Sequence, residues 1–266
     1  MLVDFNEDVS LRGAFRRQRR VILALMLRNM RTRFFGSGLG FLLAIAWPLS
    51  HILIFIAVSL YAGRQAPVGE SAALFFGTGS ATFMAFSYLG QFTMQSLLMT
   101  RPLLGFPEVK LLDVVFAAAA LEVLSAFTVT LTLLTLGYFF GVNVMPRSVE
   151  DAACAYGSAI LLGLGVGILN SLLAMQVPMW SMIFALSRIT LWLASGVIFF
   201  PDNIPEPART WMSYNPIAQS VEWMRSAYFE GVGYGFLDRA YTIKFGLVTV
   251  FLGLLIERVT RGYLLR

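Results

Sequence analysis

The stretch that decides the fold is AACAYGSAILLGLGVGILNSLLAMQVPMWSMIFALS, residues 152–187, which runs for 36 residues without a charged side chain. A membrane crossing needs about 20 apolar residues, so this stretch is too long for one crossing. Pro178 divides it, because proline interrupts a helix. The stretch therefore predicts two membrane helices, at about 153–174 and 179–200, joined by a very short turn.

Four further stretches are apolar enough to cross a membrane. Two of them, 39–60 and a segment within 71–100, carry no charge, and the other two contain charged residues. These are about 114–141, which contains Glu122, and about 237–256, which contains Lys244. The chain is thus predicted to be an all-α integral membrane protein with six transmembrane helices.

The composition agrees with this fold class. Of 266 residues, 58% are hydrophobic and only 13% are charged, whereas a soluble domain carries about 25% charged residues. The mean hydropathy is +0.73. These values exclude an ordinary soluble or disordered protein, and they disfavour nucleic acid as a partner despite the net charge of +5. The single cysteine, Cys154, lies in an apolar run, and we expect it to be a buried core residue.

The distribution of Lys and Arg predicts the orientation in the membrane. With six spans, both termini lie on one side, which would carry 13 basic residues against 5 on the other side. Eight of the 13 are arginines that precede residue 34. Because cytoplasmic loops are enriched in Lys and Arg, both termini are predicted to be cytoplasmic.

Two segments outside the spans have helical patterns. In residues 12–33, apolar side chains gather on one side and arginines on the other, which predicts an amphipathic helix in the membrane interface. A signal peptide is the alternative, but the apolar run 21–27 is only seven residues long and lacks a small-residue cleavage site. Residues 201–236 contain two helix starts, near Pro205 and at Asn215-Pro216, which predict a re-entrant helical hairpin between spans five and six.

Several kinds of chemistry have no basis in the sequence. It contains no Gly-Lys-Ser/Thr, so no P-loop is predicted, and a single His and a single Cys make a metal site improbable. Ser195-Gly196 and His51 raise the alternative of an intramembrane serine protease. The residue order and Leu193, where such a site would have glycine, disfavour it. We predict no catalytic residues and no metal.

The charges within spans indicate functional or structural partners. Glu122 and Arg188 are costly in the bilayer, at about 2.5–3.5 kcal/mol each on insertion scales, so both are expected to face the bundle interior. They pair with each other, or each reaches a helix end or a separate polar partner.

Aromatic residues are concentrated near the predicted hairpin, where 11 of the 50 residues from 192 to 241 are Phe, Trp or Tyr. An interfacial aromatic belt is one explanation. A stacking surface for sugar rings is the other.

The loop 99–113 between spans two and three contains Leu103, Leu104 and Phe106 among charged residues. Exposed apolar residues in a wet loop favour docking to another protein. The alternative is a helix that rests on lipid.

Three segments resemble a known family: RTRFFGSGLGFLLAIAWPL at 31–49, TRPLLGFPEVKLLDV at 100–114 and YNPIAQSVEWMRSAYFEG at 214–231. Over nearly its whole length the chain resembles the permease subunits of ABC transporters that export capsular polysaccharide from Gram-negative bacteria. These permeases are related to O-antigen and teichoic-acid export permeases.

The resemblance implies a homodimer in the inner membrane, with two ATP-binding subunits that carry ATP and Mg while this chain binds no cofactor. It implies contacts to the ATPase at residues 12–33 and 99–113, and a polysaccharide pathway capped by the hairpin. A periplasmic adaptor, an outer-membrane channel and membrane lipid complete the expected partners. The candidate residues are Arg101, Pro102, Lys110 and Asp113 for ATPase coupling, and Trp211, Tyr214, Trp223 and Tyr228 for the substrate pathway.

The predicted organisation is a cytoplasmic N-terminus with the interface helix (1–38), a six-span domain (39–257) and a cytoplasmic tail (258–266). Within the six-span domain lie the coupling loop (99–113) and the re-entrant segment (201–236). The expected function is ATP-driven export of capsular polysaccharide, with no enzymatic activity in this chain. The alternatives are export of O-antigen, another lipid-linked glycan or a drug by the same architecture, an ion-coupled carrier, and an intramembrane enzyme.

Overall fold

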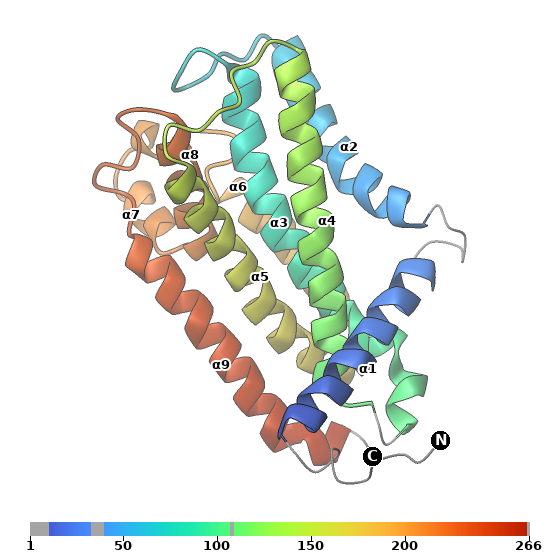
Figure 1. Cartoon of the computed structure of the whole chain (residues 1–266). Helices are drawn as coiled ribbons and strands as arrows, with labels where there is room; N and C mark the ends of the chain where they lie inside the picture. Colours follow the sequence, from blue (N-terminus) through green and yellow to red (C-terminus); the bar gives the residue numbers. More distant parts are fainter. Residues whose placement is uncertain (1–10, 33–39, 107–108, 265–266) are drawn as a thin grey trace.

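The computed structural model describes residues 11–32, 40–106 and 109–264. Arg33, Arg266, residues 1–10 and residues 107–108 of the loop lie outside the described residues. Throughout the described part the chain is helical and has no strand. The helices are α1 (Leu11–Thr32), α2 (Gly40–Tyr61), α3 (Ala72–Met99), α4 (Leu111–Phe139), α5 (Val149–Gln176), α6 (Trp180–Leu193), α7 (Ala208–Ser213), α8 (Pro216–Tyr228) and α9 (Arg239–Leu264), with short 3-10 turns η2 (Arg101–Gly105) and η3 (Pro201–Asn203) (Figure 1).

Five of these helices, α2, α3, α4, α5 and α9, are long and apolar enough to cross a membrane. They match five of the six predicted spans, and their starts follow local capping rules. Ser71 caps α3 by accepting a hydrogen bond from the Leu74 amide at 3.3 Å, and Ser148 caps α5 by accepting one from the Asp151 amide at 3.1 Å. The helix α9 extends to Leu264, so most of the predicted tail is helical. A Glu257–Arg261 pair at 2.9 Å supports this last turn.

The predicted fifth span, 179–200, differs from the structure. Its helix α6 has 14 residues and ends at Leu193, followed by non-helical backbone to the turn η3. Fourteen residues span about 21 Å, less than the apolar thickness of a bilayer, about 30 Å. The residues 194–200 are apolar or small, so hydropathy alone extended the helix through them. A contact from α8, described below, holds them in another conformation.

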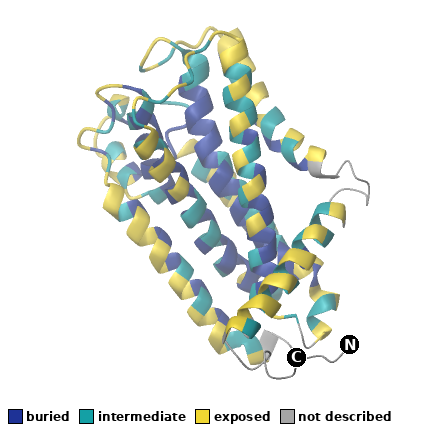
Figure 2. Ribbon diagram, viewed as in Figure 1, coloured by how far each residue is buried: buried dark blue, intermediate teal, exposed yellow. Residues whose placement is uncertain are grey.

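The helix α5 lies between α3 and α9, and glycines permit this close packing. A Cβ on Gly163 would lie 2.8 Å from the Phe86 carbonyl of α3, and one on Gly167 would lie 2.7 Å from Thr93 Cβ. On the other side, Gly253 of α9 faces Ile168 in the same way. Small residues at such positions let helix backbones approach closely in membrane proteins. The buried residues accordingly concentrate in α3 and α5, at the centre of the bundle (Figure 2).

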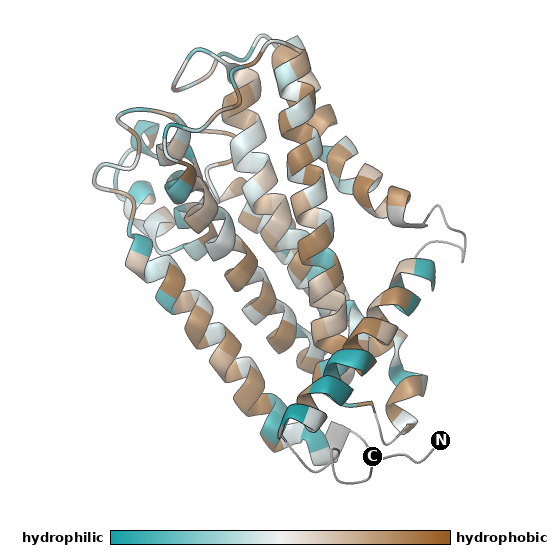
Figure 3. Cartoon of the chain, in the orientation of Figure 1, coloured by the Kyte–Doolittle hydropathy of each residue, from teal (hydrophilic) through white to brown (hydrophobic). Residues whose placement is uncertain are grey.

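The helix α1 packs across one end of the bundle. Its Leu25 belongs to a buried cluster with Leu111 and Val115 of α4, and Gln18 Nε2 donates to Asp113 Oδ1 at 3.0 Å. The turn η2 and the C-terminal part of α9 lie at this same end, whereas α7 and α8 lie at the other (Figure 1). Hydrophilic residues concentrate at these two ends and apolar residues between them (Figure 3).

The expectation for Cys154 was wrong, because its side chain is exposed. Cys154 lies near the start of α5, on a side of the helix that neither α3 nor α9 covers, while the neighbouring Ala155 and Tyr156 are buried. When a helix carries apolar residues on all of its faces, the sequence does not show which face packs against other helices.

Candidate functional site

The hairpin region is assembled around the start of α8. Asn215 caps α8 by accepting a hydrogen bond from the Ile217 amide at 3.2 Å, as its position before Pro216 indicated. The Asn215 amide also donates to the Ala194 carbonyl at 3.1 Å, which ties α8 to the end of α6. Gln219 Nε2 donates to the Ser213 and Phe236 carbonyls at 2.8 and 3.0 Å. The two short helices and the start of α9 therefore form one hydrogen-bonded unit.

The helix α8 is enclosed by the bundle. It packs against α3, α5 and α9, and a chain of hydroxyl groups, Ser158–Ser220–Thr242, crosses from α5 to α9 with distances of 2.8 and 3.1 Å. Ten of its 13 residues are buried: Ile217, Ala218, Gln219, Ser220, Val221, Glu222, Trp223, Met224, Arg225 and Ala227. A short polar helix in this position is held by hydrogen bonds as well as by apolar packing.

The shorter helix α7 lies at the surface. Glu206 Oε2 accepts hydrogen bonds from the amide and hydroxyl of Thr210 at 3.1 and 2.6 Å. The hydroxyl hydrogen bond holds the pKa of Glu206 below its usual value, so this carboxylate stays ionised at the start of the helix. Arg209 forms an ion pair with Asp202 in the turn before it.

The four predicted pathway aromatics fall into two groups. Trp211 and Tyr214 are 75% and 67% exposed and are available for stacking. Trp223 is 4% exposed, and its Nε1 donates to Asp151 Oδ1 at 3.0 Å. Tyr228 packs among buried side chains between α3 and α5. The structure therefore does not bring the four together on one surface, and Trp223 and Tyr228 have packing roles here.

The sequence reasoning also missed Tyr234, which is 79% exposed in the loop after α8. It borders a cavity of about 560 Å³ that is also lined by Arg147, Glu230 and Arg239. The signal was present, because Tyr234 lies among three glycines that have positive φ angles and mark an exposed loop: Gly231, Gly233 and Gly235.

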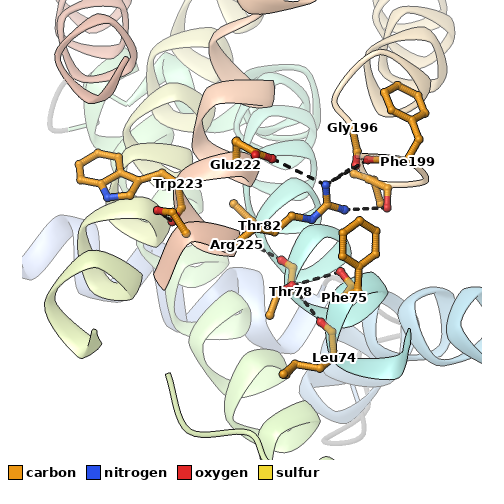
Figure 4. Close-up of polar contacts among 11 residues, drawn as sticks. Leu74, Phe75, Thr78, Thr82, Gly196, Phe199, Glu222, Trp223 and Arg225 are labelled. Carbon is orange, nitrogen blue, oxygen red and sulfur yellow. Dashed lines mark hydrogen bonds and ion pairs between the residues drawn. The ribbon is translucent and has the colours of Figure 1, made fainter. Parts of the chain in front are cut away.

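Arg225 is the principal residue that the sequence reasoning misplaced. It was counted among the loop charges of the non-cytoplasmic side, yet its side chain is fully buried. Its guanidinium donates to the carbonyl groups of Gly196 at 2.6 Å, Val197 at 3.0 Å and Phe199 at 3.1 Å (Figure 4). These carbonyls belong to the non-helical backbone after α6. The available signal was the spacing of three residues between Glu222 and Arg225, which places both charges on one side of a short helix.

The coupling loop has an exposed part and a packed part. Arg101 and Lys110 are exposed, and Pro102 is the second residue of the turn η2. Asp113 instead is 2% exposed, accepts hydrogen bonds from the Lys110 amide at 3.2 Å and from Gln18, and so caps α4 and anchors α1. Its role in the structure is local stabilisation.

The apolar residues of this loop divide in the same way. Leu103 and Leu104 pack against the buried cluster under α1, whereas Phe106 is 58% exposed. Only part of the apolar surface expected in the loop is therefore available to a partner.

The two charges predicted inside the bundle have different neighbours in the structure. Arg188 Nε donates to Ser87 Oγ at 2.7 Å, and its guanidinium lies 5.8 Å from the centre of the Tyr88 ring. Glu122 is 4% exposed and lines a cavity of about 650 Å³ together with Arg28 and Trp47. Pairing of Glu122 with Arg188 stays a prediction.

The residues considered for a serine protease have other partners. The Ser195 hydroxyl donates to the Leu191 carbonyl, and His51 Nδ1 shares a hydrogen bond with the Tyr88 hydroxyl at 2.8 Å. His51 itself is exposed. The structure gives no support to this alternative.

Comparison with known proteins gives the chain its relatives. No protein-family model matches it. The polysialic acid transport protein KpsM of Escherichia coli is 27% identical over 247 residues, which cover 93% of this chain and 96% of KpsM. The capsule polysaccharide export inner-membrane proteins CtrC of Neisseria meningitidis and BexB of Haemophilus influenzae are each 23% identical, over 92% and 93% of this chain and 93% and 96% of their own lengths. Over more than nine-tenths of its length the chain is thus similar to capsule polysaccharide export inner-membrane proteins, in agreement with the family that its sequence motifs resemble.

Proposed function

We propose that this chain is the transmembrane permease subunit of an ATP-driven exporter that moves capsular polysaccharide across the inner membrane. The observation that carries the proposal is the similarity to capsule polysaccharide export inner-membrane proteins over more than nine-tenths of the chain. The helical bundle supports it, because five apolar helices of sufficient length provide a transmembrane scaffold. A lipid-linked polymer is the substrate form that we favour.

In this proposal the energy comes from two separate ATP-binding subunits, because the sequence has no Gly-Lys-Ser/Thr. ATP and Mg bind to those subunits. They dock at the end of the bundle that carries α1 and η2, where Arg101, Lys110 and Phe106 are exposed. Their closure on ATP binding moves α1 and η2, and the packing of both against α4 transmits this movement to the spans.

The proposed membrane arrangement has both termini in the cytoplasm and α1 in the interface. The fifth span along the chain, which brings the number of crossings to six, is formed by α6 together with residues 194–200. The helices α7 and α8 form the re-entrant segment. Two copies of the chain form the exporter. The exposed apolar side chains along α2 and α6, such as Trp47, Ile54 and Leu186, are available to a second copy or to lipid. A periplasmic adaptor and an outer-membrane channel continue the path.

Trp211 and Tyr214 are the residues that we propose for contact with the polymer. Aromatic faces stack on the C–H faces of sugar rings through many weak contacts. Such contacts hold a moving chain and release it again. Both side chains are exposed, and in the proposed orientation we expect them near the exit of the path.

The test is deletion of the gene followed by complementation. We expect surface capsule to disappear, polymer to accumulate inside the cell, and both effects to be reversed by the intact gene. Surface capsule that persists unchanged in the deletion strain would refute the assignment. Loss of O-antigen with normal capsule would support the related exporter instead, so both polymers are measured on the same cells.

A further inference from the structure

The guanidinium of Arg225 is bound in two directions. Its Nη1 and Nη2 atoms donate to the three carbonyls of the backbone that follows α6, and Phe75 of α3 stacks on it with 3.8 Å between Arg225 Cζ and the ring centre (Figure 4). Gly79 makes room for it, because a Cβ there would lie 2.9 Å from Nη2. A cation at the C-terminal end of a helix is favourable because the free carbonyls carry partial negative charge.

The carboxylate of Glu222 is a second hydrogen-bond acceptor near the Arg225 guanidinium. It lies three residues before Arg225 on the same helix, and its Oε2 is 4.0 Å from Arg225 Nη1, with both side chains buried. Within the described part of the chain, the two carboxylate oxygens and Arg225 Nε have no hydrogen-bond partner. Buried polar groups are normally paired, so a second arrangement that pairs them is favoured.

The backbone held by Arg225 could also be stabilised in another way, as a continuation of the helix α6. Residues 194–200 follow the 14-residue helix α6 directly, and 180–200 as one helix would contain 21 residues. That length matches the about 20 residues of a full crossing. In such a helix the Gly196 carbonyl would accept a hydrogen bond from the Phe200 amide, one turn later. The Val197 carbonyl would lie in the last turn, because Pro201 has no amide hydrogen to donate.

From these contacts we infer that Arg225 and Glu222 are positioning residues for opening of the non-cytoplasmic end. This inference rests on the proposed function. In the closed state, the guanidinium binds the carbonyls after α6 and holds α6 against α8. In the open state, the guanidinium transfers its hydrogen bonds to Glu222, which moves with it on α8. The freed backbone lengthens α6.

Glu222 is what makes this opening possible at moderate cost. A buried arginine that lost its only partners would be strongly destabilising, because its charge would remain without compensation. With the carboxylate on the same helix, the charge is balanced in both states. Glu222→Gln keeps the size of the side chain and removes the charge, so it is expected to trap the closed state.

The experiment measures how fast a cysteine placed in the segment after α6 reacts with a reagent from outside the cell. Cys154 is replaced by serine, and Ser195, which is fully buried, is replaced by cysteine as the reporter. The full chain is kept in its membrane with its natural partners, and a membrane-impermeant maleimide labels the reporter. We expect about tenfold faster labelling in Arg225→Gln and an intermediate rate in Arg225→Lys. Arg147→Gln is the matched control, because Arg147 is exposed and pairs with Glu230 outside this cluster.

A second measurement separates positioning from mere stability. Glu222→Gln is expected to accumulate to the wild-type amount and to label slowly, while export of surface polymer falls about tenfold. A purely structural role predicts that export per molecule of folded protein stays normal, because the loss of one partner of a buried pair would then act only on stability. Normal export per molecule in Glu222→Gln would therefore overturn the inference. This test remains decisive if Arg225→Gln does not accumulate and cannot be labelled.

The labelling rate tests the Arg225 contact independently of whether the chain exports capsule. Labelling of Arg225→Gln at the wild-type rate in folded protein would overturn the inference even if capsule export is confirmed. Faster labelling in a strain whose deletion leaves surface capsule unchanged would support the contact and refute the exporter assignment.

Discussion

The two ends of the molecule use arginine in opposite ways. At the end with α1 and η2, Arg101 and most of the arginines of α1 are exposed. At the other end, Arg225 is fully buried and binds three backbone carbonyls. The first group can act on lipid headgroups or a docked partner without a large effect on folding, because exposed charges remain solvated. The second determines the local fold. Position in the bundle thus decides whether an arginine acts outward or inward.

The largest expected effect is at Arg225. Arg225→Met leaves three carbonyls and the Glu222 carboxylate without a cation, and breaking a buried pair costs about 3–5 kcal/mol. We expect a marked fall in the unfolding temperature of the detergent-purified chain. Arg147→Met is the exposed counterpart, whose pair with Glu230 is worth about 0–1 kcal/mol. Equal losses of unfolding temperature in the two variants would show that the buried and the exposed arginine contribute equally to stability, which contradicts the contrast drawn above.

Two tryptophans test the same contrast within the hairpin region. Trp223→Ala removes a buried ring and its hydrogen bond to Asp151, and we expect a loss of about 3–5 kcal/mol in the free energy of unfolding. Trp211→Ala changes a ring that is 75% exposed, so the expected loss is below about 0.5 kcal/mol.

For Trp211→Ala, polymer export is expected to fall several-fold at constant protein amount. Thermal unfolding and surface-polymer assays on the same preparations check both variants. A stable Trp211→Ala protein with full export would remove Trp211 from the pathway.

The helix α5 offers a matched pair of glycines. Gly167→Ala places a Cβ 2.7 Å from Thr93 Cβ, and such overpacking costs about 1–3 kcal/mol. Gly157 has open space at the corresponding position, so Gly157→Ala is expected to be neutral or to stabilise by up to about 1 kcal/mol. The difference between the two unfolding temperatures measures the contact of α5 with α3. No difference would mean that the two helices are farther apart than described.

The smallest effect on stability is expected at Arg101. Arg101→Glu reverses an exposed charge, so the unfolding temperature should change by no more than the equivalent of about 0.5 kcal/mol. Export driven by the ATPase is expected to fall clearly, because the reversed charge repels an acidic contact on the partner. Polymer export and co-purification of the ATPase are measured together. Normal values of both would refute a docking role for Arg101.

Local patterns in the sequence were sufficient for most helices. The capping residues Ser71, Ser148 and Asn215 and the break at Pro178 lie where the structure begins or ends its helices. These signals act within a few residues, so they can be identified without knowledge of the fold. The connection between α3 and α4 lies within the predicted range 99–113 for the same reason, and its coupling role stays a prediction.

The roles of individual side chains were less predictable. Trp223 and Tyr228 were predicted to line a pathway, and in the structure Trp223 is buried and Tyr228 is partly buried against the same cluster. The coupling role of Asp113 stays a prediction, and the structure adds that Asp113 caps α4 and binds Gln18, 95 positions earlier in the chain. Aromatic and acidic side chains serve both purposes equally well. Which purpose applies depends on neighbours that are distant in sequence.

The sequence by itself determined that the chain is a helical membrane protein, where its long helices begin, and which family it resembles. Apolar length, capping residues and short motifs are local properties that act before the helices assemble. The tertiary structure decided that α6 ends at Leu193 and that α8 is buried. The reason is that Arg225 reaches back about thirty positions to the carbonyls after α6, and the hydrogen bonds of this buried cation outweigh the apolar pattern that would have continued the helix.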